Sequence, residues 1–135
     1  MVVDTSVLVA VVRGEADAPK LLKLMSDSPV RPRVSSVSLV EAGLVLGMGE
    51  YEDLLREIHD FDIQIVEFDS MCASIAIDAG WRYGKGRSKA RLNFGDCCSY
   101  ATAKRLGMPL LFKGKDFVHT DIEPIRASPR KRVQR

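Results

Sequence analysis

The sequence predicts an α/β fold: a single domain with a central, mostly parallel sheet of about five strands flanked by helices. Three observations indicate this class. At 135 residues the chain has room for one domain with a hydrophobic core. Its composition, 46% apolar and 28% charged, is typical of a globular protein and not of a disordered one. Short apolar runs alternate with stretches of helical spacing, which favours right-handed crossovers and a sheet covered on both faces.

The first half of the chain contains three predicted strands with helices between them. "MVV" begins the first strand and "VLVAVV" forms a short helix after it. In "APKLLKLMSD" the helical spacing places four apolar residues on one face: Leu21, Leu22, Leu24 and Met25. "PRVSSV" is the second predicted strand, and helical spacing returns from Ser38 in "SLVEAGLVLG" and, after two glycines, in "YEDLLREIHDF". "IQIVEF" is the third predicted strand.

The second half repeats this alternation. A helix is predicted over "SMCASIAIDAGWRYG", followed by a basic loop and a second helix in "GDCCSYATAKRLG", which Gly107 should end. "MPLLFK" and "IEPI" complete the set as short strands. We expect the domain to cover residues 1–127 and residues 128–135 to form a disordered basic tail.

The cysteines and the first residues both indicate the cytoplasm. Cys72, Cys97 and Cys98 are odd in number, and neighbouring side chains diverge in a helix, so we do not expect a disulfide framework. The two histidines lack ligand-like spacing to them, which argues against zinc, and buried apolar cysteines are the simpler interpretation. We expect no membrane span, and "MVVDTSVLVAVV" has an acid where a signal peptide would have basic residues.

Basic charge is concentrated in two stretches. The formal net charge is only +2, yet "RYGKGRSKAR" (82–91) and "RASPRKRVQR" (126–135) each hold five basic residues and no acid. The rest of the chain has ten basic residues against eighteen acidic ones. Such stretches suit a polyanion, although solvated loops and a frayed tail have the same composition.

Asp4 interrupts the first apolar strand, where an unpaired buried carboxylate would be costly. We therefore expect it at the strand end. In a parallel sheet the carboxyl ends of the strands and the amino ends of the helices share one edge, where ligand sites form. Three more acids belong to this edge: Glu41 in the opening turn of the helix after the second strand, Asp96 at the start of the helix before the fourth, and Asp116 after the fourth.

Four carboxylates gathered at one edge repel one another, and a divalent cation relieves that repulsion. All four candidates offer oxygen, which selects Mg²⁺ or Mn²⁺ over zinc. An ion held in this way can activate a water molecule and clamp the oxygens of a phosphodiester, so hydrolysis becomes feasible. The predicted catalytic residues and metal ligands are the same four acids: Asp4, Glu41, Asp96 and Asp116.

Three of these acids also have a purely structural interpretation. Ser38 and Glu41 match a capping box, in which Glu41 would satisfy backbone N–H groups. Asp96 could complement the helix dipole with Asn93 near the cap. Asp116 in "KGKDF" could be a turn residue.

Four motifs, "VVDTSVLVA", "VSSVSLVEA", "LNFGDCCSYATAKRLGMPLLFKGKDF" and "HTDIEPI", resemble in order and approximate spacing those of the PIN-domain ribonucleases, most closely the VapC-type toxins of toxin–antitoxin pairs. The resemblance runs from residue 1 to about residue 125. It implies a Mg²⁺- or Mn²⁺-dependent endoribonuclease that uses the same four acids, with Thr5 or Ser6 as a supporting hydroxyl. Many relatives have a Thr or Ser where this chain has Phe112 and Lys113. The resemblance therefore does not identify which residues surround the metal ligands.

For such an enzyme the basic loop and the tail would bind the RNA backbone, a contact that weakens steeply with salt. Trp81 or Tyr83 could stack on an unpaired base, although core packing suits Trp81 better. The candidate RNA-binding residues are Lys85, Arg87, Lys89, Arg91, Lys113 and Lys115.

The resemblance also implies partners, namely a homodimer and a small VapB-like antitoxin that occupies the acidic site. The predicted helices over 17–28 and 38–58 have apolar surface for a partner, although covering their own sheet is the simpler interpretation.

Two other classes of protein with an acid at a strand end fit the sequence less well. A haloacid-dehalogenase-like phosphatase needs a second Asp where this chain has Ser6. A receiver domain could use Asp69 in "EFDS" as its phosphoacceptor, but it lacks the paired acids after the first strand. The alternative that fits the four acids is a non-cleaving PIN-like module that binds RNA or protein, and metal-dependent turnover distinguishes it from a nuclease.

Overall fold

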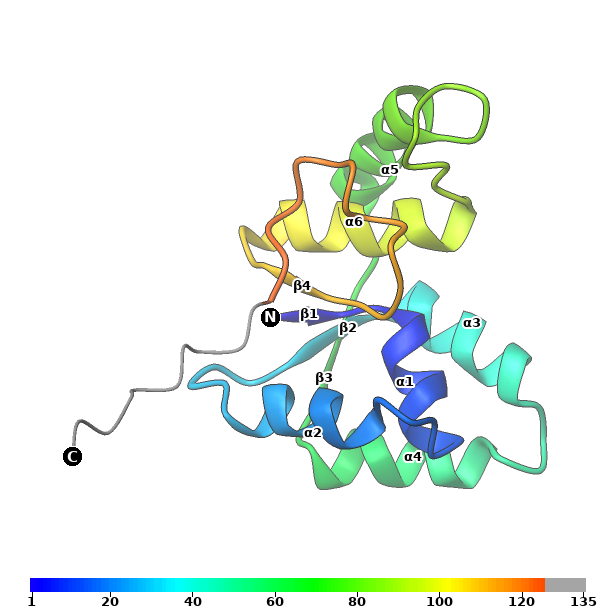
Figure 1. Ribbon diagram of the computed structural model, residues 1–135, viewed down its shortest axis with the longest axis vertical. Coiled ribbons are helices and arrows are strands. Elements are labelled where there is room, and N and C mark those ends of the chain that lie inside the picture. Colours follow the sequence, from blue (N-terminus) through cyan, green and yellow to red (C-terminus); the bar gives the residue numbers. More distant parts are fainter. Residues whose placement is uncertain (126–135) are drawn as a thin grey trace.

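One parallel sheet runs through the middle of the computed structural model, which describes residues 1–125 (Figure 1). Within that range the sheet has four strands: β1 (Val2–Val3), β2 (Arg33–Ser35), β3 (Gln64–Val66) and β4 (Leu110–Leu111). Their order in space is β3-β2-β1-β4, and all neighbours are parallel. Val2 pairs with Arg33 on one side and with Leu110 on the other. The predicted α/β class with a parallel sheet is confirmed.

The prediction of about five strands counts one too many for the described residues. "IEPI" contributes only an isolated bridge between Leu110 and Pro124. Two hydrogen bonds flank the bridge, from Leu110 N–H to Glu123 O at 2.8 Å and from Ile125 N–H to Leu110 O at 3.1 Å. The missing N–H of Pro124 does not interrupt this pairing, because its two neighbours make both hydrogen bonds. The predicted tail, 128–135, lies outside the described residues.

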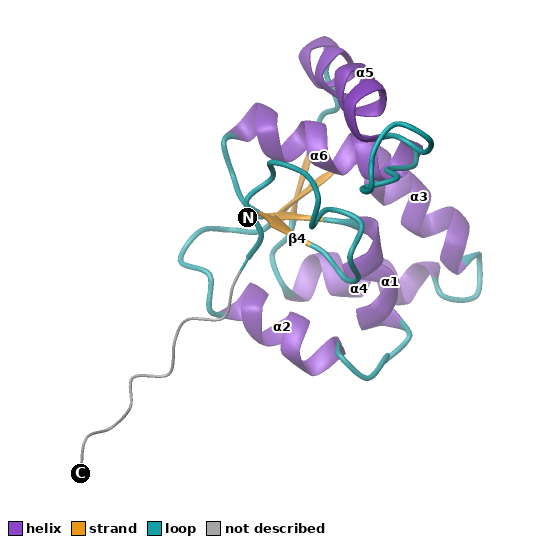
Figure 2. Cartoon of the chain, turned by 45° about the horizontal axis from the view of Figure 1, so that its top comes forward, coloured by secondary structure: helices purple, strands orange, loops and turns teal. Residues whose placement is uncertain are grey.

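The described part of the chain forms six helices: α1 (Thr5–Val12), α2 (Ala18–Ser26), α3 (Ser36–Leu46), α4 (Tyr51–Asp60), α5 (Ser70–Tyr83) and α6 (Phe94–Leu106). In Figure 1, α5 and α6 lie above the sheet, α1, α2 and α4 lie below it, and α3 extends beyond the strand ends beside α1. Figure 2 shows the same arrangement from a second direction. No helix among these residues is long and apolar enough to cross a bilayer.

Two helices begin earlier than predicted, and both begin at the sheet edge that carries the acids. Helix α1 begins at Thr5, directly after Asp4. Helix α3 begins at Ser36, because the Ser35 hydroxyl accepts a hydrogen bond from the N–H of Val37 at 3.1 Å and caps the helix. Gly107 ends α6 in the left-handed conformation, with φ of 62°, as predicted.

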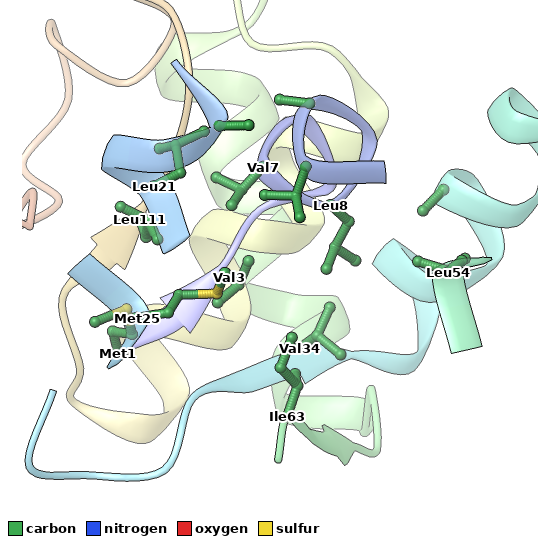
Figure 3. Close-up of a cluster of buried hydrophobic side chains, with 14 of the residues drawn as sticks. Met1, Val3, Val7, Leu8, Leu21, Met25, Val34, Leu54, Ile63 and Leu111 are labelled. Carbon is green, nitrogen blue, oxygen red and sulfur yellow. The ribbon is translucent and has the colours of Figure 1, made fainter. Parts of the chain in front are cut away.

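The short strands serve two hydrophobic clusters, one on each face of the sheet. Val3 and Leu111 belong to the cluster under α1, α2 and α4, which Figure 3 shows in close-up. Val2 and Leu110 belong to the cluster under α6. Successive residues of a strand point to opposite faces, so each two-residue strand contributes to both clusters. The three cysteines are buried, as the simpler interpretation predicted: Cys72, Cys97 and Cys98.

Candidate active site

Asp4 lies at the carboxyl end of β1 and caps α1. Its side chain is only 4% exposed. The Oδ2 atom accepts hydrogen bonds from the N–H of Ser6 at 3.0 Å and from the Ser6 hydroxyl at 2.6 Å. No Lys or Arg within residues 1–125 forms an ion pair with it. Neutral donors therefore hold one oxygen of this buried carboxyl group, and its second oxygen is left for another partner.

Glu41 lies in the second turn of α3 and not in the opening turn, because the helix begins at Ser36. The capping-box interpretation is wrong: Ser35 is the cap, and the hydroxyl of Ser38 lies inside the structure, 3.2 Å from the Ser99 hydroxyl. The Glu41 carboxylate lies over the Cα of Gly95. A methyl group added at Gly95 would come within 2.6 Å of Glu41 Cδ. Glycine at this position therefore makes room for the Glu41 carboxylate beside α6.

Asp96 is in the first turn of α6, and its structural alternative is present as a capping box. The Asn93 side chain accepts a hydrogen bond from the N–H of Asp96 at 2.8 Å, and Asp96 Oδ2 accepts one from the N–H of Asn93 at 3.0 Å. Burial nevertheless raises the pKa of Asp96 to about 6, against the effect of the Asn93 hydrogen bond and helped by the charges of Asp4, Asp116 and Glu41. The capping hydrogen bond lowers this pKa, and burial, with the charges of the other three acids, outweighs it.

Asp116 is exposed in the turn that follows β4. Its neighbour Phe117 is buried and packs against Phe112, with ring centroids 5.0 Å apart. The turn interpretation is correct as a description of the backbone, yet the charge of Asp116 acts on Asp96. The buried Phe117 fixes the turn, and the carboxylate beside it stays in contact with water.

The two hydroxyls next to Asp4 have different roles. Thr5 Oγ1 donates to the carbonyl oxygen of Ser38 at 3.2 Å and joins α1 to α3. Ser6 Oγ donates to Asp4 and accepts a hydrogen bond from the backbone N–H of Lys113 at 3.0 Å. Ser6 is therefore the hydroxyl that touches a candidate ligand, and it joins the end of β1 to the segment after β4.

The basic loop between α5 and α6 exposes four of the predicted RNA-binding residues: Lys85, Arg87, Lys89 and Arg91. Within the described chain none of them forms an ion pair. A parallel bridge between Gly84 and Leu92 closes the loop at its base. Figure 1 shows the loop leading directly into the start of α6, where Asp96 lies. Four exposed cations without ion pairs in the described chain therefore lie in the segment that leads into α6.

The two remaining basic candidates differ from each other. Lys115 is exposed in the turn after β4. The ammonium of Lys113 instead forms ion pairs with Glu15 and Asp17, between α1 and α2. Sequence reasoning missed these two acids, because no local pattern indicates a contact between segments so far apart in the chain.

Core packing of Trp81 is contradicted by the structure, since this side chain is 64% exposed. Phe94 is 80% exposed and, with Trp81 and Ile77, lines an apolar pocket of about 310 Å³ between α5 and α6. Tyr83 is half-buried against Tyr100, with ring centroids 5.7 Å apart. Of the two aromatic candidates, Trp81 is the one free to meet a partner.

The donor set fits a hard divalent cation, although the side chains do not already form a cage. No group of three acidic, histidine or cysteine side chains in residues 1–125 converges to hold a metal ion. Burial is the main cause of the raised pKa of Asp96, and the negative charges of Asp4, Asp116 and Glu41 raise it further. All the oxygens are carboxylate oxygens, the donors that Mg²⁺ and Mn²⁺ prefer. A cation that drew them together would offset the repulsion.

The PIN domain family model matches residues 1–123. The chain is 43% identical over 129 residues to "Ribonuclease VapC" of Mycolicibacterium smegmatis, covering 93% of this chain and 99% of the relative. It is 40% identical over 129 residues to "Ribonuclease VapC42" of Mycobacterium tuberculosis H37Rv, covering 92% and 98%. The chain therefore belongs to the PIN-domain family and, within it, to the VapC ribonucleases. The resemblance drawn from the four motifs is confirmed.

Solved structures agree on the fold. VapC20 of Mycobacterium tuberculosis, described as a sarcin–ricin loop cleaving toxin, superimposes with a TM-score of 0.74 at 18% identity, covering 93% of this chain and 98% of the other. A toxin–antitoxin complex from Klebsiella pneumoniae contains a chain with a TM-score of 0.67 at 18% identity, covering 89% and 92%. At this level of identity the similarity establishes the fold alone.

Proposed function

We propose that this VapC ribonuclease is the toxin of a toxin–antitoxin pair, and that it acts in the cytoplasm as a Mg²⁺- or Mn²⁺-dependent endoribonuclease. The observation that carries the metal dependence is the environment of Asp96. Burial and the charges of Asp4, Asp116 and Glu41 raise its pKa to about 6, as expected of carboxylates arranged for a cation that the protein chain itself does not supply.

The four acids would hold the ion: Asp4, Glu41, Asp96 and Asp116. When bound, a divalent cation lowers the pKa of a coordinated water and offsets charge on the phosphodiester oxygens. The chain's own contribution is to orient the ligands. Ser6 fixes Asp4, Asn93 fixes Asp96, and Gly95 leaves room for Glu41. Partners of this second layer set ligand geometry and so affect metal affinity.

The loop cations would bind the RNA backbone next to these acids. Lys85, Arg87, Lys89 and Arg91 are exposed and unpaired within the described chain, so their charge is available to phosphates. Lys115 lies one residue from Asp116 and offers a further cation at the same edge. Phosphate contacts of this kind position RNA without reading its sequence.

A VapB-like antitoxin and a second copy of the chain are the proposed protein partners. Support comes from the toxin–antitoxin complex of Klebsiella pneumoniae, which contains a chain of the same fold. The chain also exposes large apolar side chains on and after α3: Val40, Leu44, Val45 and Met48. Three of them, Val40, Leu44 and Met48, line a groove of about 510 Å³ with Tyr51 of α4. Exposed apolar surface of this extent favours a protein partner.

Cleavage of a mixed tRNA and ribosomal RNA pool tests the proposed function. Purified antitoxin-free protein should give discrete fragments with Mg²⁺ or Mn²⁺ and none with EDTA, and Asp96→Asn should give none under either condition. Fragments that persist in EDTA would contradict metal dependence. RNA binding without fragments in any metal would favour the non-cleaving PIN-like module.

A further inference from the structure

Lys113 contacts two separate parts of the molecule, one through its backbone N–H and the other through its side-chain ammonium. Its backbone N–H donates to Ser6 Oγ at 3.0 Å, and that hydroxyl donates to Asp4 Oδ2 at 2.6 Å. Its ammonium donates to Glu15 Oε2 and lies 3.3 Å from Asp17 Oδ1. One residue thus connects the α1–α2 loop, the end of β4 and the carboxylate of Asp4.

The acids that receive the ammonium are held in place by their own backbone. The N–H of Glu15 donates to Ala10 O at 2.9 Å, and the N–H of Ala18 donates to Glu15 O at 2.9 Å. Asp17 stands at the N-cap of α2 but makes no capping hydrogen bond with its side chain. Its Oδ1 is buried with no hydrogen-bond partner, so the Lys113 ammonium is its nearby compensating charge.

We propose that Lys113 is a positioning residue for the acidic site. Its ion pairs with Glu15 and Asp17 fix the chain after β4, so that its N–H holds the Ser6 hydroxyl against Asp4 and the following turn presents Asp116 to the same site. This inference rests on the proposed function, since positioning matters only if Asp4 and Asp116 bind a cation together.

The ion pairs have a second consequence for the site. An ammonium close to Asp4 and Asp116 could pair with them and compete with a divalent cation. Two carboxylates outside the site hold this ammonium instead, so the charge of Lys113 is already compensated. The same arrangement makes the side chain a poor phosphate ligand, because an RNA phosphate would have to displace Glu15 and Asp17.

Mn²⁺ affinity of the full chain, measured by isothermal titration calorimetry, tests the positioning role without relying on activity. Lys113→Met should weaken Mn²⁺ binding about tenfold, the lower end of what loss of a ligand-orienting partner costs. Lys113→Arg should keep the affinity close to that of the unchanged protein. The exchanged pair Lys113→Glu with Glu15→Lys should also keep it, because the ion pair is rebuilt with reversed polarity. Lys20→Met removes an equal charge from the neighbouring helix and should have no effect.

RNA affinity in EDTA, measured on the same variants, distinguishes a Lys113 that positions the acidic site from a Lys113 that binds RNA phosphate. Equal Mn²⁺ affinity in Lys113→Met and the unchanged protein would overturn the inference, and a loss of RNA affinity alone would assign the side chain to phosphate. If Lys113→Met does not fold, the exchanged pair decides, because failure to restore Mn²⁺ affinity also overturns the inference. Failure of the unchanged protein to bind Mn²⁺ would overturn the proposed function itself, which distinguishes the two failures.

Discussion

Gly95 and Glu41 face each other across the start of α6: the carboxylate of Glu41 occupies the space that a side chain at position 95 would need. A Cβ atom there would come within 2.6 Å of Glu41 Cδ. The Glu41 carboxylate is the end of a flexible side chain and can move away. The contact therefore constrains where the carboxylate lies more than it constrains whether the chain folds.

Gly95→Ala should abolish most RNA cleavage while leaving stability equal or slightly higher. Alanine favours a helix over glycine by up to about 1 kcal/mol, but its methyl group forces the Glu41 carboxylate out of position. Cleavage of the RNA pool in Mn²⁺ and urea unfolding would measure the two effects. Gly80→Ala is the matched control, because its Cβ would meet Cys97 Sγ at an ordinary 3.8 Å. Full activity in Gly95→Ala would refute the placement of Glu41 in the site.

Asp96→Asn should stabilise the metal-free protein at pH 7. Burial, with repulsion from the other acids, raises the pKa of Asp96 from 3.8 to about 6 in the folded state. The folded state therefore binds this proton more tightly than the unfolded state. Asp96 therefore contributes most to the free energy of unfolding below about pH 4, and this contribution is lost as the pH rises through about 6. At pH 7 the ionised Asp96 is a cost of up to about 3 kcal/mol, since one pKa unit corresponds to about 1.4 kcal/mol.

Urea unfolding in EDTA at pH 7 and pH 5 would measure this cost. The stability difference between Asp96→Asn and the unchanged protein should be largest at pH 7 and smaller at pH 5. A difference that does not vary with pH, or a variant less stable at pH 7, would mean that Asp96 acts mainly as the helix cap seen in its bonds with Asn93.

Neutralising three loop cations together should weaken RNA binding and its salt dependence. The variant combines Lys85→Gln, Arg87→Gln and Lys89→Gln. If all three meet phosphates of single-stranded RNA, the slope of log affinity against log salt should fall by about two. The matched control neutralises Lys20, Lys23 and Arg56 on α2 and α4, on the other side of the sheet in Figure 1. Equal slopes for the two triple variants would show that the loop does not bind the backbone.

The sequence predicts the sheet edge well because strand alternation and helix order are local. Asp4 stands out because a carboxylate directly after the apolar strand residues Val2 and Val3 is difficult to explain by a purely structural role. The start of α3 is not fixed by the sequence, because "SSVS" offers several serine caps and only the folded chain selects Ser35 over Ser38. One choice of cap therefore moved Glu41 from the first helical turn to the second.

The features that the sequence does not predict depend on tertiary contacts. The ion pair between Lys113 and Glu15 joins residues 98 positions apart, and no pattern in "KGKDF" or "RGEADA" indicates it. Trp81 lies on an outer helical face, and an aromatic residue alone does not reveal whether that face is covered. Within residues 1–125, "IEPI" pairs with β4 only through the bridge between Leu110 and Pro124, and its apolar pattern alone does not reveal how short that pairing is.

The carboxyl pKa of Asp96, measured by ¹³C NMR on protein with labelled aspartate and assigned with Asp96→Asn, tests the central claim most directly. If four carboxylates share one site for a cation, this pKa is near 6 in metal-free protein and falls when Mg²⁺ is added, because the cation favours the ionised form. A pKa near 4 that does not respond to Mg²⁺ would contradict the account, since it would mean that the acids neither interact nor bind the ion together.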